Sequence, residues 1–84
     1  MKKQIYSIYD NVAGMWLDPF YATNKATAIR TFSDACNDER SQFNKHPDDY
    51  VLYHVGVWDD QKGTIEPNDT NENQGRANDY LRAV

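Results

Sequence analysis

The segment YVLYHVGVW, residues 50–58, decides the fold of this chain. It is rich in β-branched and aromatic residues, and such residues favour the extended conformation of a pleated sheet. We therefore predict that it forms the main strand of an antiparallel sheet. Simple alternation puts Val51, Tyr53, Val55 and Val57 on one face, and Tyr50, Leu52, His54, Gly56 and Trp58 on the other.

Flanking segments predict the other strands. Residues 4–9, QIYSIY, carry apolar side chains on both parities, which is typical of a central strand. Turn-forming residues 10–14 then return the chain as a second strand over 15–21, in which Pro19 indicates an edge position or a bend. After the main strand, residues 59–63 predict a hairpin turn and residues 64–66 a short return strand ending at Pro67.

One amphipathic helix is expected between the two hairpins, beginning near Asn24 and fraying near Arg40. Its apolar residues follow the spacing of a single helical face. The predicted fold is α+β with the order ββαββ, in which one helix lies on one face of a four-stranded antiparallel sheet with the first and third strands central. The residues of the apolar helical face are Ala28, Ile29, Phe32, Ala35 and Cys36.

The expected domain organisation is a single domain over residues 1–67 followed by a polar tail over residues 68–84. The segment 68–78 has almost no apolar side chains, so it has little to bury in return for the entropy lost on ordering. We expect this tail to be flexible, with Tyr80, Leu81 and Val84 able to dock its end.

Composition excludes several protein classes. The chain has 84 residues, a formal net charge of −4 and one cysteine, Cys36. A lone cysteine cannot form an intrachain disulfide and suits a reducing compartment such as a cytoplasm. We identify no signal peptide and no apolar stretch long enough to cross a membrane. The acidic balance argues against coating nucleic acid by charge alone.

The sheet face that the helix cannot reach is the first place to look for function. Aromatic residues make up 13% of the sequence, which is more than a domain this small is expected to bury. We predict that Tyr6 or Tyr9, with Leu52, His54 and Trp58, is exposed there in a monomer. A homodimer that buries this face is one solution.

Enzymatic chemistry is not indicated. Cys36 and His54 are a conceivable nucleophile and base, but Cys36 lies on the apolar helical stripe, where a buried inert thiol is the usual finding. The acidic pairs at 48–49 and 59–60, with His46, match no calcium loop or zinc spacing. We therefore expect no catalysis, no metal and no cofactor.

Binding of single-stranded nucleic acid is the sharper alternative to core packing and a dimer interface. Stacking on exposed rings, supported by nearby cations, is physically sufficient for such binding. The acidic net charge favours packing and dimerisation over nucleic acid. The cations considered are Lys2, Lys3, Lys25, Arg30 and Lys45, and the rings are Tyr6, Tyr9, Tyr53 and Trp58.

A set of short segments in a fixed order also resembles a known family. They are IYSIYD at 5–10, PF at 19–20, AIRTF at 28–32, DACND at 34–38 and FNKHPDDY at 43–50. Through these segments, residues 5–59 resemble the small nonstructural protein of gokushoviruses, single-stranded DNA bacteriophages of the Microviridae. The segment that ends in Lys45-His46-Pro47 and Tyr50 is the most specific.

The resemblance implies a protein made in the cytoplasm of an infected bacterium, absent from the capsid and acting in single-stranded DNA synthesis or packaging. It implies no active site. The expected partners are single-stranded DNA, a phage or host replication or packaging protein, or a second copy of the chain, and no membrane. The candidate binding residues are Lys3, Tyr6, Tyr9, Arg30, Lys45, His46, Tyr50, Tyr53 and Trp58.

Overall fold

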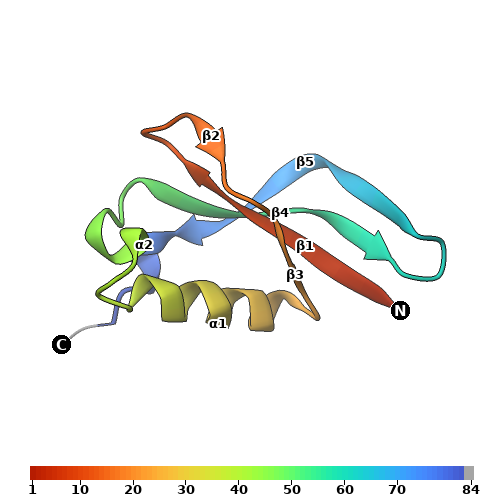
Figure 1. Cartoon of the computed structure of the whole chain (residues 1–84), viewed down its shortest axis with the longest axis horizontal. Helices are drawn as coiled ribbons and strands as arrows, with labels where there is room; N and C mark the ends of the chain where they lie inside the picture. Colours follow the sequence, from red (N-terminus) through yellow and green to blue (C-terminus); the bar gives the residue numbers. More distant parts are fainter. Residues whose placement is uncertain (83–84) are drawn as a thin grey trace.

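The computed structural model of the chain describes residues 1–82 and has the predicted α+β architecture (Figure 1). A long, twisted antiparallel sheet has one main helix lying along one of its faces. The elements are β1 (Lys2–Asp10), β2 (Met15–Trp16), β3 (Phe20–Ala22), α1 (Lys25–Cys36), α2 (Gln42–Lys45), β4 (Tyr50–Asp59), β5 (Thr64–Arg76) and the 3-10 helix η1 (Ala77–Tyr80).

The sheet order is β2-β1-β4-β5, with β3 also paired to β1, so the first and third predicted strands are central as expected. The predicted second strand is divided into β2 and β3, which pair with β1 at separate places. Pro19 lies between them and has no backbone N–H to continue a ladder. The fold therefore keeps the order ββαββ, with the second strand in two pieces.

Helix α1 begins where the sequence predicted, because Asn24 caps it: the Asn24 side chain accepts a hydrogen bond from the Thr27 N–H at 2.8 Å. Its buried side chains are Ala28, Phe32 and Cys36. They pack against the sheet residues Tyr6, Ile8, Ala22, Tyr50 and Leu52 and against Ala77 of η1 in the same core.

The predicted exposure of the main strand is wrong in part, because the helix covers the face that carries Tyr6 and Leu52. Tyr6 is 2% exposed and Leu52 is 0% exposed. The face of β4 also changes along its length, since Tyr6 pairs with His54 but the preceding Ile5 pairs with Gly56. Val55 is thus the extra residue of a β-bulge, which breaks the simple alternation.

The predicted flexible tail is also wrong over the residues that the structure describes. β5 does not stop at Pro67 but continues along β4, pairing Tyr53 with Asn73 and Val51 with Arg76. An edge strand tolerates a proline, and β5 shifts register close to Pro67. Backbone pairing with β4 replaces the missing apolar burial, so the expected boundary after residue 67 falls inside a strand. Val84, expected to dock with the tail, lies outside the described residues.

The segment between α1 and β4 also forms a helix that the sequence did not predict. Ser41 caps α2 by accepting from the Asn44 N–H at 3.1 Å. Phe43 then packs against Phe32 and Tyr50, with ring centroids 5.6 and 4.9 Å away. α2 therefore belongs to the helical layer. Within residues 1–82, no helix is both long and apolar enough to cross a membrane.

Candidate functional site

The helix-free face of the sheet gathers aromatic side chains from four strands. Strand β1 is regular, so its odd-numbered residues all lie on this face, opposite Tyr6 and Ile8. Two of them, Ile5 and Ser7, are buried, and the Ser7 hydroxyl donates to the Leu17 carbonyl at 2.7 Å. Directly paired residues of antiparallel strands share a face. The register thus brings together a set that we call the aromatic face: Lys3, Tyr9, Trp16, Tyr21, Tyr53, Trp58 and Arg76.

The rings of the aromatic face form two clusters. In the first, Trp16 lies between Tyr9 and Tyr53, with ring centroids 5.0 and 5.1 Å away. In the second, Tyr21 and Trp58 are 6.5 Å apart and line a shallow hollow of about 310 Å³ together with Lys3. Tyr9 is six positions after Lys3 in β1, so the clusters are about 20 Å apart along the strand.

These rings are accessible to a ligand. Trp16 is 44% exposed and Tyr21 is 53% exposed, and each lies against partly buried rings, namely Tyr9 and Tyr53 beside Trp16 and Trp58 beside Tyr21. A partly buried ring is held in one orientation yet keeps a face or an edge open. This arrangement is typical of platforms on which planar ligands stack.

The paired carboxylates of the sheet are confined to one face, whereas its cations lie on both, with Lys2 beside Asp59 on the helix side. Lys3 pairs with Trp58 and Arg76 pairs with Val51, which places both cations on the aromatic face. The strand carboxylates that have a register partner are all on the helix side: Asp10, Asp59, Glu66 and Glu72, paired with Tyr50, Lys2, Val57 and His54. The aromatic face is therefore locally basic in an acidic protein.

The structure brings four of the predicted binding residues together and separates the others from them. Lys3, Tyr9, Tyr53 and Trp58 are all on the aromatic face. Tyr6 and Tyr50 are core residues, 2% and 9% exposed, so their rings are not available for stacking. The remaining three are exposed in the helical layer or at its end: Arg30 in α1, Lys45 in α2 and His46 just after α2.

Sequence reasoning missed three residues of this face: Trp16, Tyr21 and Arg76. Trp16 had a signal that was wrong by one residue: closing the predicted turn over residues 10–14 as a hairpin places Met15 opposite Tyr9, whereas the observed loop is one residue shorter and pairs Tyr9 with Trp16. Tyr21 and Arg76 had none. Their positions depend on the break at Pro19 and on the continuation of β5 past Pro67.

The thiol and imidazole considered for catalysis do not form a pair. Burial raises the pKa of the Cys36 thiol to about 11, which makes the thiolate inaccessible near neutral pH. Both ring nitrogens of His54 are engaged: Nε2 is 2.8 Å from Gln4 Oε1 and Nδ1 is 2.8 Å from Asn68 Nδ2. The amide oxygen of Gln4 accepts and the amide nitrogen of Asn68 donates, which fixes the neutral tautomer that carries its proton on Nε2.

Metal-ligating groups are likewise dispersed in residues 1–82, where no three His, Cys, Asp or Glu side chains gather as a metal site would require. The carboxylates that the sequence singled out act within loops. Asp59 accepts from the backbone N–H groups of Gln61 and Lys62 at 3.0 and 3.2 Å. Asp48 accepts from the Asn78 side chain at 3.0 Å.

Comparison with known proteins assigns the chain to a family. The family model described as "Phage ORF5 protein" matches residues 3–80. The chain belongs to the phage ORF5 protein family. One relative is Protein ORF5 of Chlamydia phage 1, which is 35% identical over 68 residues, spanning 76% of this chain and 71% of that protein. No solved structure matches.

Membership of the phage ORF5 family confirms the resemblance drawn from the sequence, because Chlamydia phage 1 is a gokushovirus of the Microviridae. The family match also extends beyond residues 5–59 and includes β5 and η1. It makes the chain a bacteriophage accessory protein. The aromatic face is the candidate binding surface of this ORF5 protein.

Proposed function

We propose that this phage ORF5 protein is a non-enzymatic accessory protein that binds single-stranded DNA on its aromatic face. The observation that supports this proposal is the coincidence of exposed rings with Lys3 and Arg76 on the face that α1 leaves open. Stacked bases need ring faces and phosphates need cations, and this face offers both. Its action belongs in the host cytoplasm, in DNA synthesis or packaging.

The separation of the two ring clusters sets the length of the ligand. A strand that contacts both clusters must span about 20 Å. This requires several nucleotides, in keeping with sites of about four nucleotides or more on other small sheet-based domains. Base identity matters little, because every base has a face that stacks.

Fluorescence anisotropy with labelled single-stranded oligonucleotides tests the proposal. We expect binding that weakens steeply between about 50 and about 200 mM salt. The variant Trp16→Ala removes the central ring of the first cluster, and stacking of one base is worth about 1 to 3 kcal/mol. Arg30→Gln, on α1, is the matched surface control and should leave affinity close to that of the wild type.

Homodimerisation is the competing use of the same face. Ile65 pairs with Trp58 and is 58% exposed, which adds apolar area to the aromatic face. Light scattering at increasing protein concentration measures the oligomeric state. A stable dimer that is unaffected by DNA and lost in Trp16→Ala would refute the DNA proposal in favour of a protein interface. Absence of DNA binding at low salt would refute it as well.

A further inference from the structure

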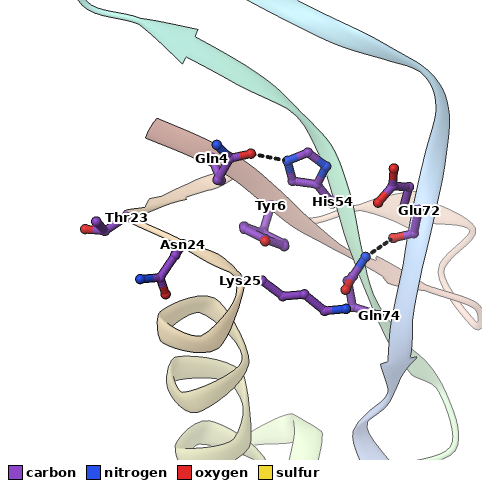
Figure 2. A pocket seen from close by; sticks show the side chains of 8 residues that line it. All are labelled: Gln4, Tyr6, Thr23, Asn24, Lys25, His54, Glu72 and Gln74. Atoms are coloured by element: carbon purple, nitrogen blue, oxygen red, sulfur yellow. Dashed lines mark hydrogen bonds between the residues drawn. The ribbon is translucent and has the colours of Figure 1, made fainter. Parts of the chain in front are cut away.

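A second concave site lies on the helix side of the sheet, apart from the aromatic face. It is an open pocket of about 310 Å³, within the size range of small-molecule sites. Figure 2 shows the ring of Tyr6 between the side chains of Gln4 and Lys25, with His54 and Glu72 on the strands beyond. The pocket occurs where α1 begins, so the helix leaves this end of the sheet uncovered.

The Tyr6 hydroxyl is the first indication that this pocket takes a ligand. Tyr6 is 2% exposed, and its hydroxyl has no hydrogen-bond partner within residues 1–82. Because no fully buried side-chain oxygen or nitrogen in that range lacks a partner, this hydroxyl keeps some accessible surface. Tyr6 is one of the residues that line the pocket. Burial, and secondarily the Glu72 carboxylate, raise the pKa of Tyr6. The hydroxyl is therefore a protonated donor, free to donate to whatever enters the pocket, either water or a ligand.

Two opposite charges also line the pocket without meeting. Lys25 and Glu72 form no salt bridge with each other or with any charged group in the described part of the chain. Lys25 lies in the first turn of α1, where free backbone N–H groups and the helix dipole also favour an anion. Glu72 comes from β5 and favours a ligand group that donates hydrogen bonds.

The other polar groups of the wall are already arranged. His54 is fixed between Gln4 and Asn68, and the Gln74 side chain donates to the Glu72 carbonyl at 3.1 Å. The free recognition groups are thus a phenol, an ammonium, a carboxylate and the hydroxyl of Thr23. A simple anion in the pocket would be repelled by the Glu72 carboxylate, and a simple cation would be repelled by the Lys25 ammonium. The complementary ligand carries an anionic group and a hydrogen-bond-donating edge at its two ends.

We propose that this pocket binds a nucleoside monophosphate unit, with the phosphate at Lys25 and the hydroxyl of Tyr6 and an amino group of the base at Glu72. Carboxylates accept from the exocyclic amine of cytosine, and adenine and guanine also carry such amines. Thymine has none. The pocket therefore prefers amino-bearing bases to thymine. The aromatic face has no such preference, because it binds bases by stacking.

Two-dimensional amide NMR of the full chain, titrated with dCMP, dTMP, deoxycytidine and inorganic phosphate, tests the assignment. We expect shifts at residues 23–25, 54 and 72–74, with dCMP binding most tightly. Lys25→Gln should weaken dCMP about tenfold, and Glu72→Gln should reduce the preference for dCMP over dTMP to about unity. Lys62→Gln, in the β4–β5 turn, is the matched control for charge and should bind as the wild type does.

Tyr6→Phe removes the hydroxyl and keeps the ring, so it should weaken dCMP severalfold while the amide spectrum stays folded. Tyr50→Phe is the control, because Tyr50 is a buried tyrosine outside the pocket. Inorganic phosphate binding as tightly as dCMP, or equal losses in Lys25→Gln and Lys62→Gln, would overturn the proposal. So would an absence of shifts in the pocket at millimolar dCMP.

The source of the nucleotide is a separate arm of the same experiment. A short oligonucleotide with a 5′-phosphate, compared with its 5′-hydroxyl form, asks whether the pocket holds the end of a DNA strand. If the amide signals of pocket residues shift only with the 5′-phosphorylated oligonucleotide, the pocket binds the end of a DNA strand. If they shift with dCMP but with neither oligonucleotide, the pocket binds a free nucleotide. The proposal does not depend on the aromatic face, because mononucleotides are too short to reach both ring clusters.

Discussion

Tyr53 and Trp58 lie on the same face of β4 although five positions separate them. Tyr53 pairs with Ser7 and Trp58 pairs with Lys3, both odd-numbered residues of the regular strand β1. The bulge at Val55 supplies the extra residue that makes this geometry. The two ring clusters share one surface because of this single irregularity.

Gly56 is required beside the bulge. A Cβ at this position would be 2.7 Å from the Glu66 carbonyl oxygen and 3.2 Å from the Pro67 Cα, both backbone atoms of β5. We expect Gly56→Ala to lower the free energy of unfolding by about 2 kcal/mol, because β5 must move away. Urea unfolding followed by tryptophan fluorescence measures this loss.

Gly63→Ala is the control for Gly56→Ala. Gly63 has open space around it but a φ of +67°, so its substitution tests backbone conformation alone. That effect amounts to about 1 to 2 kcal/mol. A free energy of unfolding for Gly56→Ala equal to that of the wild type would contradict the prediction. It would mean that a small shift of β5 restores the pairing and that the close approach at Gly56 has no energetic role.

The salt dependence of DNA binding separates the cations of the aromatic face from those elsewhere. Each phosphate contact on a single strand contributes about 0.7 to the slope of log affinity against log salt. We expect Lys3→Gln and Arg76→Gln each to reduce that slope by about 0.7, and Arg30→Gln to leave it unchanged. Anisotropy titrations over a range of salt concentrations give the slopes. Equal effects of all three substitutions would mean that DNA is attracted by overall charge and not bound at this face.

The sequence predicted the layers of this fold better than it predicted the faces. The apolar stripe around Phe32 and the start of the helix near Asn24 are local signals, and both predictions are confirmed. Which face of the sheet the helix covers depends on packing between distant segments, so Tyr6 and Leu52 were placed on the wrong side. No local pattern marks Val55 as a bulge, because its partner strand is fifty residues earlier in the chain.

The end of the chain shows the same limit. Residues 68–76 are polar because both sides of this edge strand are largely in contact with water. Composition alone describes such a segment as flexible, while its backbone hydrogen bonds to β4 depend on a partner that composition does not reveal. Of the candidate site, the sequence identified Tyr9, Tyr53, Trp58 and Lys3, which lie on or next to the two predicted central strands.

Tyr80 fastens this C-terminal segment to the core. Its hydroxyl donates to the Gln74 carbonyl, and its ring lies 5.7 Å from that of Phe32. We expect Tyr80→Ala to lower the free energy of unfolding by about 2 to 3 kcal/mol, since a half-buried ring is lost, and Tyr80→Phe by about 1 kcal/mol. Urea unfolding of both variants is the measurement. A wild-type stability for Tyr80→Ala would show that η1 does not support the fold.

Cys36 gives the protein a dependence on alkaline pH. Burial raises the pKa of its thiol to about 11 in the folded chain, against about 8.5 in an unfolded one. A raised pKa means that the folded state holds the proton more tightly. Its stabilising effect is therefore complete below about pH 8.5 and is lost as the pH rises toward the folded value.

Comparison of the wild type with Cys36→Ala isolates this effect. We expect the free energy of unfolding of the wild type to fall between about pH 8.5 and about pH 10 by on the order of 2 kcal/mol, and that of the variant to fall much less. Above that window both proteins should lose stability, because burial is also the main cause that raises the pKa values of Tyr6, Tyr50 and Tyr80. Urea unfolding at a series of pH values gives both curves. The prediction rests on the complete burial of Cys36 in the core between α1 and the sheet. Parallel curves across the window would contradict it, because they would show that the thiol ionises as readily in the folded chain as in the unfolded one.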